Sequence, residues 1–123
     1  MLTSPDTFDP LTLVADWLDA CRWRELNTLL DLYDGRATLE CDCEQLRLTG
    51  RKWIAAYWAP KLETKVVLAF SLHEIAMTAD GVRVEYLDHE GKPLRMDFRF
   101  SPSGKISHQL CSRFAQPKNV PDG

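Results

Sequence analysis

The sequence predicts one α+β domain, a helix-lined cup in which three N-terminal helices pack on a curved, mostly antiparallel sheet. Up to about residue 62, apart from two short strand patterns near 37–48, apolar residues recur at helical spacing. Beyond that point the chain alternates like strands, and glycine- or proline-containing turns separate the segments. The 123 residues, of which 45% are hydrophobic and 27% charged, suffice for one folded core.

The first helix is expected to begin at Asp9-Pro10. Asp9 is suited to cap it, and Pro10 is suited to its first turn. Apolar residues then follow every three or four positions as far as Cys21, so one face is buried. That face includes Trp17 or its neighbour Leu18.

Two more helices follow in the pattern. The second carries the leucines from residue 26 onward and extends to Tyr33, where Asp34-Gly35 is expected to end it with a left-handed turn. The third runs over 51–62, and its Trp53 and Tyr57, four residues apart, are expected to form one stripe against the sheet.

Strand patterns fill the rest of the chain. Short strands are expected near 37–41 and 45–48, and four longer ones form an antiparallel meander. The longer strands span 66–77, 82–90, 94–100 and 105–114. The domain is expected to cover 1–115, and the proline-rich and polar segment 116–123 is expected to be a flexible tail.

Composition excludes several classes of protein. The net charge of −3, with basic and acidic residues interspersed, is not that of a nucleic-acid-binding protein. Residues 1–10 contain no apolar run, which predicts neither a signal peptide nor a membrane segment. We therefore expect no nucleic-acid partner, no membrane association and a cytoplasmic location.

The four cysteines do not form the spacing of a disulfide framework. Cys41-x-Cys43 has no matching second pair of ligands, and the three histidines do not cluster with it in the sequence. Free thiols in a reducing compartment are the expectation, with no metal and no cofactor.

Two segments carry a resemblance to a known superfamily. The first runs over 14–58 and includes YDGRATLE at 33–40 and LTGRKWIAAYW at 48–58; the second is MDFRFSPSGKI at 96–106. Together they resemble the nuclear transport factor 2-like superfamily, which includes SnoaL-like cyclases and ketosteroid isomerases. The resemblance extends from about Asp9 to Phe114 and implies a cone-shaped barrel with an apolar pocket.

The positions that carry isomerase chemistry in that superfamily differ here. By resemblance, the phenol falls on Trp17, the carboxylate base on Cys41 with Asp42 one residue away, and the protonated acid on Met96. An indole and a thioether cannot replace a phenol and a carboxylic acid as proton donors of that kind. A one-residue slip would turn Asp42 inward, but it would also expose buried apolar residues.

Two other chemistries of the superfamily have partial counterparts in this sequence. The water-activating residues of limonene-epoxide hydrolases are matched in part by Arg83 and Glu85, but the last-strand acid falls near Cys111. SnoaL-like cyclases use an acid and a histidine, for which His73 and His108 are available. His108 is the better proton-transfer candidate, since it shares parity with Ile106 and Leu110 unless a bulge intervenes.

We therefore expect a SnoaL-like protein whose apolar pocket binds a small hydrophobic molecule. The pocket residues are Trp17, Cys41, Tyr57, Tyr86, Met96 and Phe98. The alternative is a proton-transfer isomerase or polyketide-cyclase-like enzyme, in which His108 or Asp42 moves a proton while Tyr86 or Tyr57 supplies a hydrogen bond.

The resemblance also implies partners. Members of this superfamily commonly dimerise through the convex face of the sheet, and the outward residues Arg95, Asp97 and Arg99 suit a homodimer of this kind. A third class, a protein-interaction adaptor, would require an exposed apolar patch.

Overall fold

The computed structural model describes residues 9–113, and its first helix begins where the sequence predicts. The side chain of Asp9 accepts hydrogen bonds from the backbone N–H groups of Leu11 and Thr12 at the start of α1 (Pro10–Arg22). This capping supplies partners for amides that have none within the helix. Both Trp17 and Leu18 are buried, so the helix turns the predicted face to the sheet.

The second helix is shorter than predicted. α2 (Leu26–Asp31) ends before Tyr33, and Tyr33 is already the first residue of β1 (Tyr33–Cys41). The prediction that Asp34-Gly35 ends a helix is therefore wrong. Tyr33 is fully buried and its side chain forms hydrogen bonds within the core, which fixes the backbone there in extended form.

The third helix confirms its predicted range but not its predicted buried face. It follows β2 (Leu46–Thr49), and α3 (Arg51–Lys61) buries Ile54, Tyr57 and Trp58. Trp53 is 55% exposed, because the i, i+3, i+4 stripe is centred on Ile54 and leaves Trp53 at its edge. Within residues 9–113, the helices are all too short or too polar to cross a bilayer.

The predicted antiparallel meander is present, but its first strand begins later in the chain than predicted. The strands are β3 (Leu72–Met77), β4 (Val82–Leu87), β5 (Pro93–Phe100) and β6 (Ile106–Arg113). The prediction that a strand begins at Val66 is wrong, because residues 66–71 form consecutive turns and Phe70 has a left-handed φ of 63°. Phe114 and the segment 116–123 lie outside the described residues.

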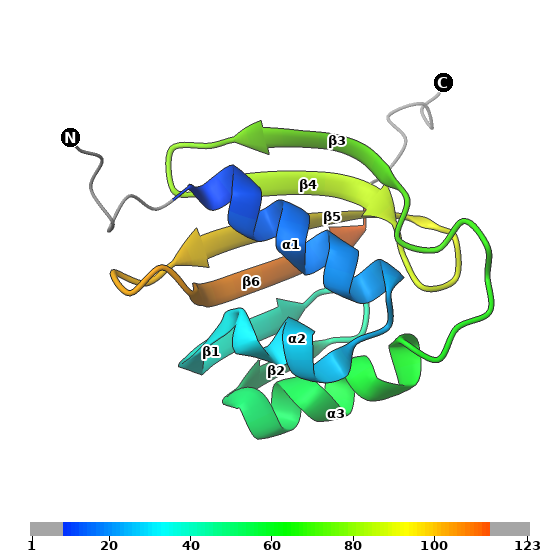
Figure 1. Ribbon diagram of the computed structural model, residues 1–123, viewed down its shortest axis with the longest axis horizontal. Helices are drawn as coiled ribbons and strands as arrows, with labels where there is room; N and C mark the ends of the chain where they lie inside the picture. Colours follow the sequence, from blue (N-terminus) through cyan, green and yellow to red (C-terminus); the bar gives the residue numbers. More distant parts are fainter. Residues whose placement is uncertain (1–8, 114–123) are drawn as a thin grey trace.

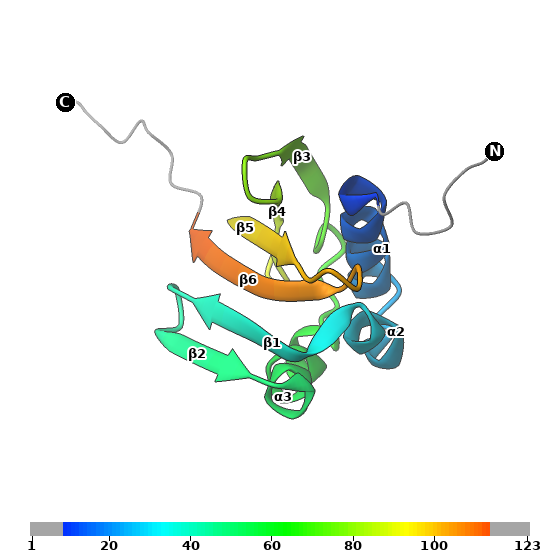
Figure 2. The ribbon, with the colours of Figure 1, turned by 90° about the vertical axis from the view of Figure 1, so that its left-hand side faces the viewer.

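The six strands form one curved sheet in the order β2-β1-β6-β5-β4-β3. All neighbouring strands are antiparallel except β1 and β6, which are parallel. The helices lie on the concave face: α1 contacts β3 and β4, and α3 contacts β1 and β2 (Figures 1 and 2). In the described part of the chain, the other face of the sheet carries no helix.

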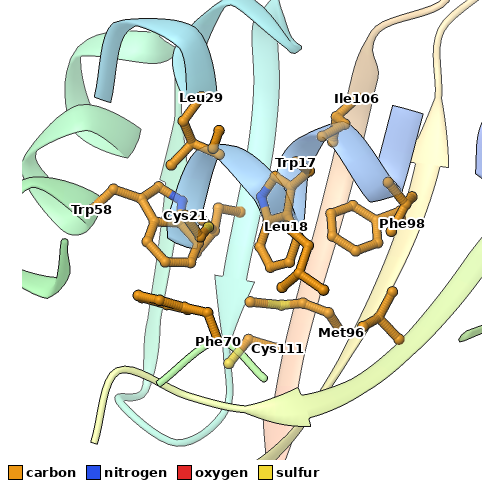
Figure 3. Packing of buried hydrophobic residues seen from close by; sticks show 14 of the residues in the cluster. Trp17, Leu18, Cys21, Leu29, Trp58, Phe70, Met96, Phe98, Ile106 and Cys111 are labelled. Atoms are coloured by element: carbon orange, nitrogen blue, oxygen red, sulfur yellow. The ribbon is translucent and has the colours of Figure 1, made fainter. Parts of the chain in front are cut away.

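The core is centred on Trp17. Its ring makes edge contacts with the rings of Trp58, Tyr86 and Phe98, at centroid distances of 5.7, 5.5 and 5.0 Å. Figure 3 shows Trp17 between Trp58 and Phe98, with Met96 beneath them. Edge-to-face pairs of this kind stabilise a core beyond the burial of their area.

A polar group lies within this apolar core. The Tyr33 hydroxyl accepts hydrogen bonds from the indole nitrogens of Trp17 (3.2 Å) and Trp58 (3.1 Å), and it donates to Oε1 of Gln109. The Gln109 amide nitrogen in turn lies 3.1 Å from the sulfur of Met96. Helices α1 and α3 are thereby linked to β1 and β6 through one oxygen atom.

We expect Tyr33→Phe to destabilise the protein by about 3 kcal/mol, because two indole N–H groups and one amide oxygen lose their partner while still buried. Tyr86→Phe is the matched control, since the Tyr86 hydroxyl is equally buried and has no hydrogen bond within residues 9–113. Urea unfolding measures both variants. Equal stability of the two variants would contradict the assigned role of Tyr33.

Candidate functional site

A cavity of about 200 Å³ lies between the second half of α3 and the carboxyl ends of β1, β4 and β6. The residues of its deeper wall are mostly aromatic or sulfur-containing: Cys41, Tyr57, Trp58, Phe70, Tyr86, Leu94 and Cys111. Its remaining lining residues are Cys43, Glu44, Lys61, Asp88, His89, Glu90 and Arg113. The cavity therefore joins an apolar wall to a polar one.

The structure brings together half of the predicted pocket. Cys41, Tyr57 and Tyr86 line the cavity. Trp17, Met96 and Phe98 do not line it, because they are packed into the core with exposures of 0%, 0% and 1%. The alternation that places Met96 and Phe98 on the inner face is confirmed, but side chains from α1 fill the space in front of them.

The two predicted proton-transfer residues lie outside the cavity. Asp42 is exposed in the turn after β1, while its neighbour Cys41 points inward. His108 lies on the convex face of the sheet, where its Nε2 is 2.9 Å from a carboxylate oxygen of Glu40. This hydrogen bond lowers the pKa of Glu40.

His108 does not share the inward direction of Ile106, because β6 contains an irregularity between these two residues. Phe100 pairs with Ile106 but Arg99 pairs with His108, so one extra residue separates the two registers. After this bulge the inward positions are Gln109 and Cys111. Gln109, which the sequence reasoning did not select, therefore occupies the buried place that parity gave to His108.

The inner wall carries three thiols, two from neighbouring strands and one from the turn after β1. Parallel pairing places Cys41 of β1 beside Cys111 of β6, with their sulfur atoms 3.4 Å apart. Cys43 lies in the turn after β1, and the sulfur atoms of all three cysteines are within 4.8 Å of one another. The Cys41-x-Cys43 spacing is visible in the sequence. Cys111 lies 68 positions beyond Cys43, and no sequence pattern connects it with the other two cysteines.

Hydrogen bonds make one of these thiols acidic. The bond with Cys111, together with one from the Tyr57 hydroxyl at 3.6 Å, lowers the pKa of the Cys41 thiol to about 6. The same bond and burial raise the pKa of Cys111. The pair therefore loses its first proton easily and its second with difficulty.

The charges at the cavity are largely paired within the chain. The Lys61 ammonium lies 2.9 Å from a carboxylate oxygen of Glu44 and 3.8 Å from the centre of the Tyr57 ring. The Asp88 carboxylate accepts hydrogen bonds from the backbone N–H groups of Glu90 and Lys92. Such a lining favours an uncharged ligand over a strongly charged one.

One buried polar group on the cavity wall lacks a partner. Tyr86 is 2% exposed and lines the cavity, yet its hydroxyl makes no hydrogen bond to another of residues 9–113. Burial raises the pKa of this phenol, so it is protonated and able to donate. A buried hydroxyl without a partner in a native protein requires a physical explanation.

A second hollow, of about 240 Å³, is a groove between a helix and the sheet. It lies between α1 and the strands β3 and β4, and its lining is almost entirely aliphatic. It lacks the convergence of polar and titratable groups that marks the first cavity.

Comparisons with known proteins identify the fold. No protein-family model and no curated protein sequence matches the chain. Solved structures do match. A SnoaL-like protein of unknown function from Burkholderia thailandensis is 20% identical, with a TM-score of 0.70 over 90% of this chain and 97% of that chain.

Two enzymes also share the fold. A steroid delta-isomerase from Pseudomonas aeruginosa is 19% identical, with a TM-score of 0.63 over 89% of this chain and 82% of that one. The epoxide hydrolase/cyclase-like enzyme SalBIII, of pyran ring formation in the polyether salinomycin, is 19% identical, with a TM-score of 0.64 over 84% and 88%. The chain thus has the nuclear transport factor 2-like fold that its sequence resembles, and at these identities the likeness concerns fold alone.

We expect a maleimide to label Cys43 first in the native protein. Cys43 is half-exposed, whereas Cys21, Cys41 and Cys111 are buried, so access separates them. Peptide mapping by mass spectrometry after brief labelling identifies the site, and Cys43→Ser should remove the fast phase. Persistence of that phase in the variant would show that the turn after β1 opens and exposes another thiol.

Proposed function

We propose that this protein binds a small, uncharged and mainly apolar molecule in the cavity beside α3. The observation that carries the proposal is Tyr86, which lines the cavity and whose buried hydroxyl has no hydrogen-bond partner among residues 9–113. A ligand with a carbonyl or hydroxyl oxygen would supply that partner. The cost of leaving the hydroxyl unsatisfied would then contribute to affinity and to selectivity.

The size of the cavity narrows the class of ligand. At about 200 Å³ it is smaller than the roughly 300–1,000 Å³ of pockets that take drug-sized ligands. Trp17 and Phe98 fill the deeper part of the cone, where a larger molecule would have to lie. A ligand of about one ring therefore suits the site, whereas a four-ring steroid does not.

The aromatic wall supports the same class. Tyr57, Trp58 and Phe70 present ring surface to the cavity, and Phe70 stacks on Tyr86 at an interplanar angle of 15°. A flat ring can make favourable contacts with these faces and edges. Aromatic ketones and phenols combine such a ring with the oxygen that Tyr86 would bind.

Proton transfer by His108 or Asp42, with Tyr86 or Tyr57 as hydrogen-bond donor, stays a prediction. Neither His108 nor Asp42 lines the cavity, so a ligand bound there would not meet them. Tyr57 and Tyr86 do line it, and that placement suits binding as well as it suits catalysis. Binding is therefore the function that the geometry supports best.

We expect compounds of about one ring, such as acetophenone or phenol, to bind, and steroids to fail. Tyr86→Phe should weaken binding about tenfold, the loss of one buried hydrogen bond to the ligand. The measurement is tryptophan fluorescence in a Trp23→Phe, Trp53→Phe background, because these two residues are exposed and would otherwise mask the buried Trp58 beside the cavity.

His108→Ala is the matched control, since it removes a polar ring from the opposite face of the sheet. Its affinity should equal that of the parent. Binding that is lost in His108→Ala but kept in Tyr86→Phe would overturn the proposal and place the binding site on the convex face.

We also propose that the convex face forms a homodimer. Its predicted residues Arg95 and Asp97 are paired within the chain, with Glu85 at 2.9 Å and with Arg83 at 2.8 Å. Because these charges are already balanced, a second copy could pack without net repulsion against the half-buried Leu110, which pairs with Asp97 across β5 and β6.

Sedimentation equilibrium should give twice the chain mass of 14.1 kDa, and Leu110→Asp should return the protein to a monomer. Met77→Asp, at an exposed position on the sheet edge, is the control and should leave the mass unchanged. A monomer at all accessible concentrations would contradict the proposal.

A further inference from the structure

The three thiols on the cavity wall form a possible set of metal ligands, although Cys111 is distant in the sequence from Cys41 and Cys43. Cys41 and Cys111 are neighbours across the parallel pair of strands β1 and β6. Cys43 is brought back to them by the turn over 42–45, in which the backbone and side-chain amides of Gln45 bond to the Asp42 carbonyl. All three sulfur atoms lie within 4.8 Å of one another.

We propose that Cys41, Cys43 and Cys111 bind one thiophilic d¹⁰ cation, Zn²⁺, with its fourth coordination position open to the cavity. This inference does not rest on the proposed ligand, because the metal site is complete on the protein side without one. It replaces the sequence-based expectation of no metal, which considered Cys41-x-Cys43 without a third cysteine.

The spacing of the sulfur atoms suits zinc. A Zn–S bond of about 2.3 Å in a tetrahedron places neighbouring sulfur atoms about 3.8 Å apart. The Cys41–Cys111 separation of 3.4 Å and the 4.8 Å limit for the three atoms bracket this value. Shifts of less than about 1 Å are needed, and the half-buried Cys43 in its turn can supply them.

The site would carry a net negative charge of −1, from three thiolates and one Zn²⁺. The cavity lining includes two cationic side chains, Arg113 and Lys61, of which Lys61 is already paired with Glu44. When the metal binds, each of the three S–H groups forms a Zn–S bond and releases its proton to solvent, without any change of oxidation state. A three-ligand site with one free position is the arrangement of catalytic rather than structural zinc.

The remaining cysteine provides an internal comparison. Cys21 is fully buried in α1, away from the cavity wall, and belongs to the hydrophobic core. A buried thiol in that setting behaves as a small apolar side chain. Substitution of Cys21 therefore shows whether the loss of any thiol affects metal binding, or only the loss of one of the three clustered thiols.

The test is titration of the reduced, chelator-treated full chain with Zn²⁺ alone, in competition with a chromophoric chelator, and a parallel titration with Co²⁺. We expect one metal ion per chain, with the sulfur-to-cobalt charge-transfer and d–d bands of tetrahedral thiolate coordination. Cys43→Ser should weaken Zn²⁺ binding by roughly 100-fold or more, because it removes a metal ligand itself and not a residue that only positions a ligand. Cys21→Ala should bind as the parent does.

Cys43→Ser is the primary variant because its side chain is half-exposed, and far-UV circular dichroism and thermal melting verify that it folds. The inference is overturned if the folded parent binds no Zn²⁺ while its thiols remain reduced. It is equally overturned if Cys43→Ser binds as tightly as the parent. Aromatic-ketone binding measured in the presence of chelator is a separate result, so failure of one proposal leaves the other intact.

Discussion

The buried Tyr33 hydroxyl accepts hydrogen bonds from two indole N–H groups and donates one to Oε1 of Gln109. Water does not reach this point. Each of these polar groups would be costly to bury without a hydrogen-bond partner, and here each supplies a partner for another. Because the four residues come from α1, α3, β1 and β6, the network ties both helices to the middle of the sheet at one point. The arrangement of the core and the depth of the cavity follow from this network.

The same network explains why the cavity is shallow. Trp17 and Trp58 are held by their indole nitrogens, and their rings, with that of Phe98, occupy the narrow part of the cone. The space left open lies at the other end, next to the last turn of α3 and the ends of the strands. Its wall therefore combines the thiols with the phenols of Tyr57 and Tyr86, and the carboxylates of Glu44, Asp88 and Glu90 belong to its polar part.

The structures that share this fold include a steroid delta-isomerase and an epoxide hydrolase/cyclase-like enzyme, and their chemistries differ although their backbones superpose on this chain. A cone of this kind supplies an enclosed space, and the side chains on its wall decide what happens there. In this chain the wall combines aromatic rings, sulfur atoms and a phenol that has no hydrogen-bond partner among residues 9–113. Those groups suit a small oxygen-bearing ring and a soft cation better than they suit carbon acid chemistry.

The fold could be predicted from the sequence alone because its signals are local. Helical spacing, the Asp9 cap, strand alternation and turn residues each act over a few positions, and they gave α1, α3, the meander and the inward face of β5. The errors at Tyr33, Val66 and Trp53 arose where tertiary contacts overrode those local preferences.

The tertiary structure alone decided the site. A bulge in β6 turned His108 outward and Gln109 inward, and no residue type in the sequence marks that bulge. The parallel pairing of the first and last strands placed Cys111 beside Cys41, a contact between residues 70 positions apart. Alternation fixes which residues share a face within one strand, but which strands become neighbours, and in what register, depends on the packing of the whole chain.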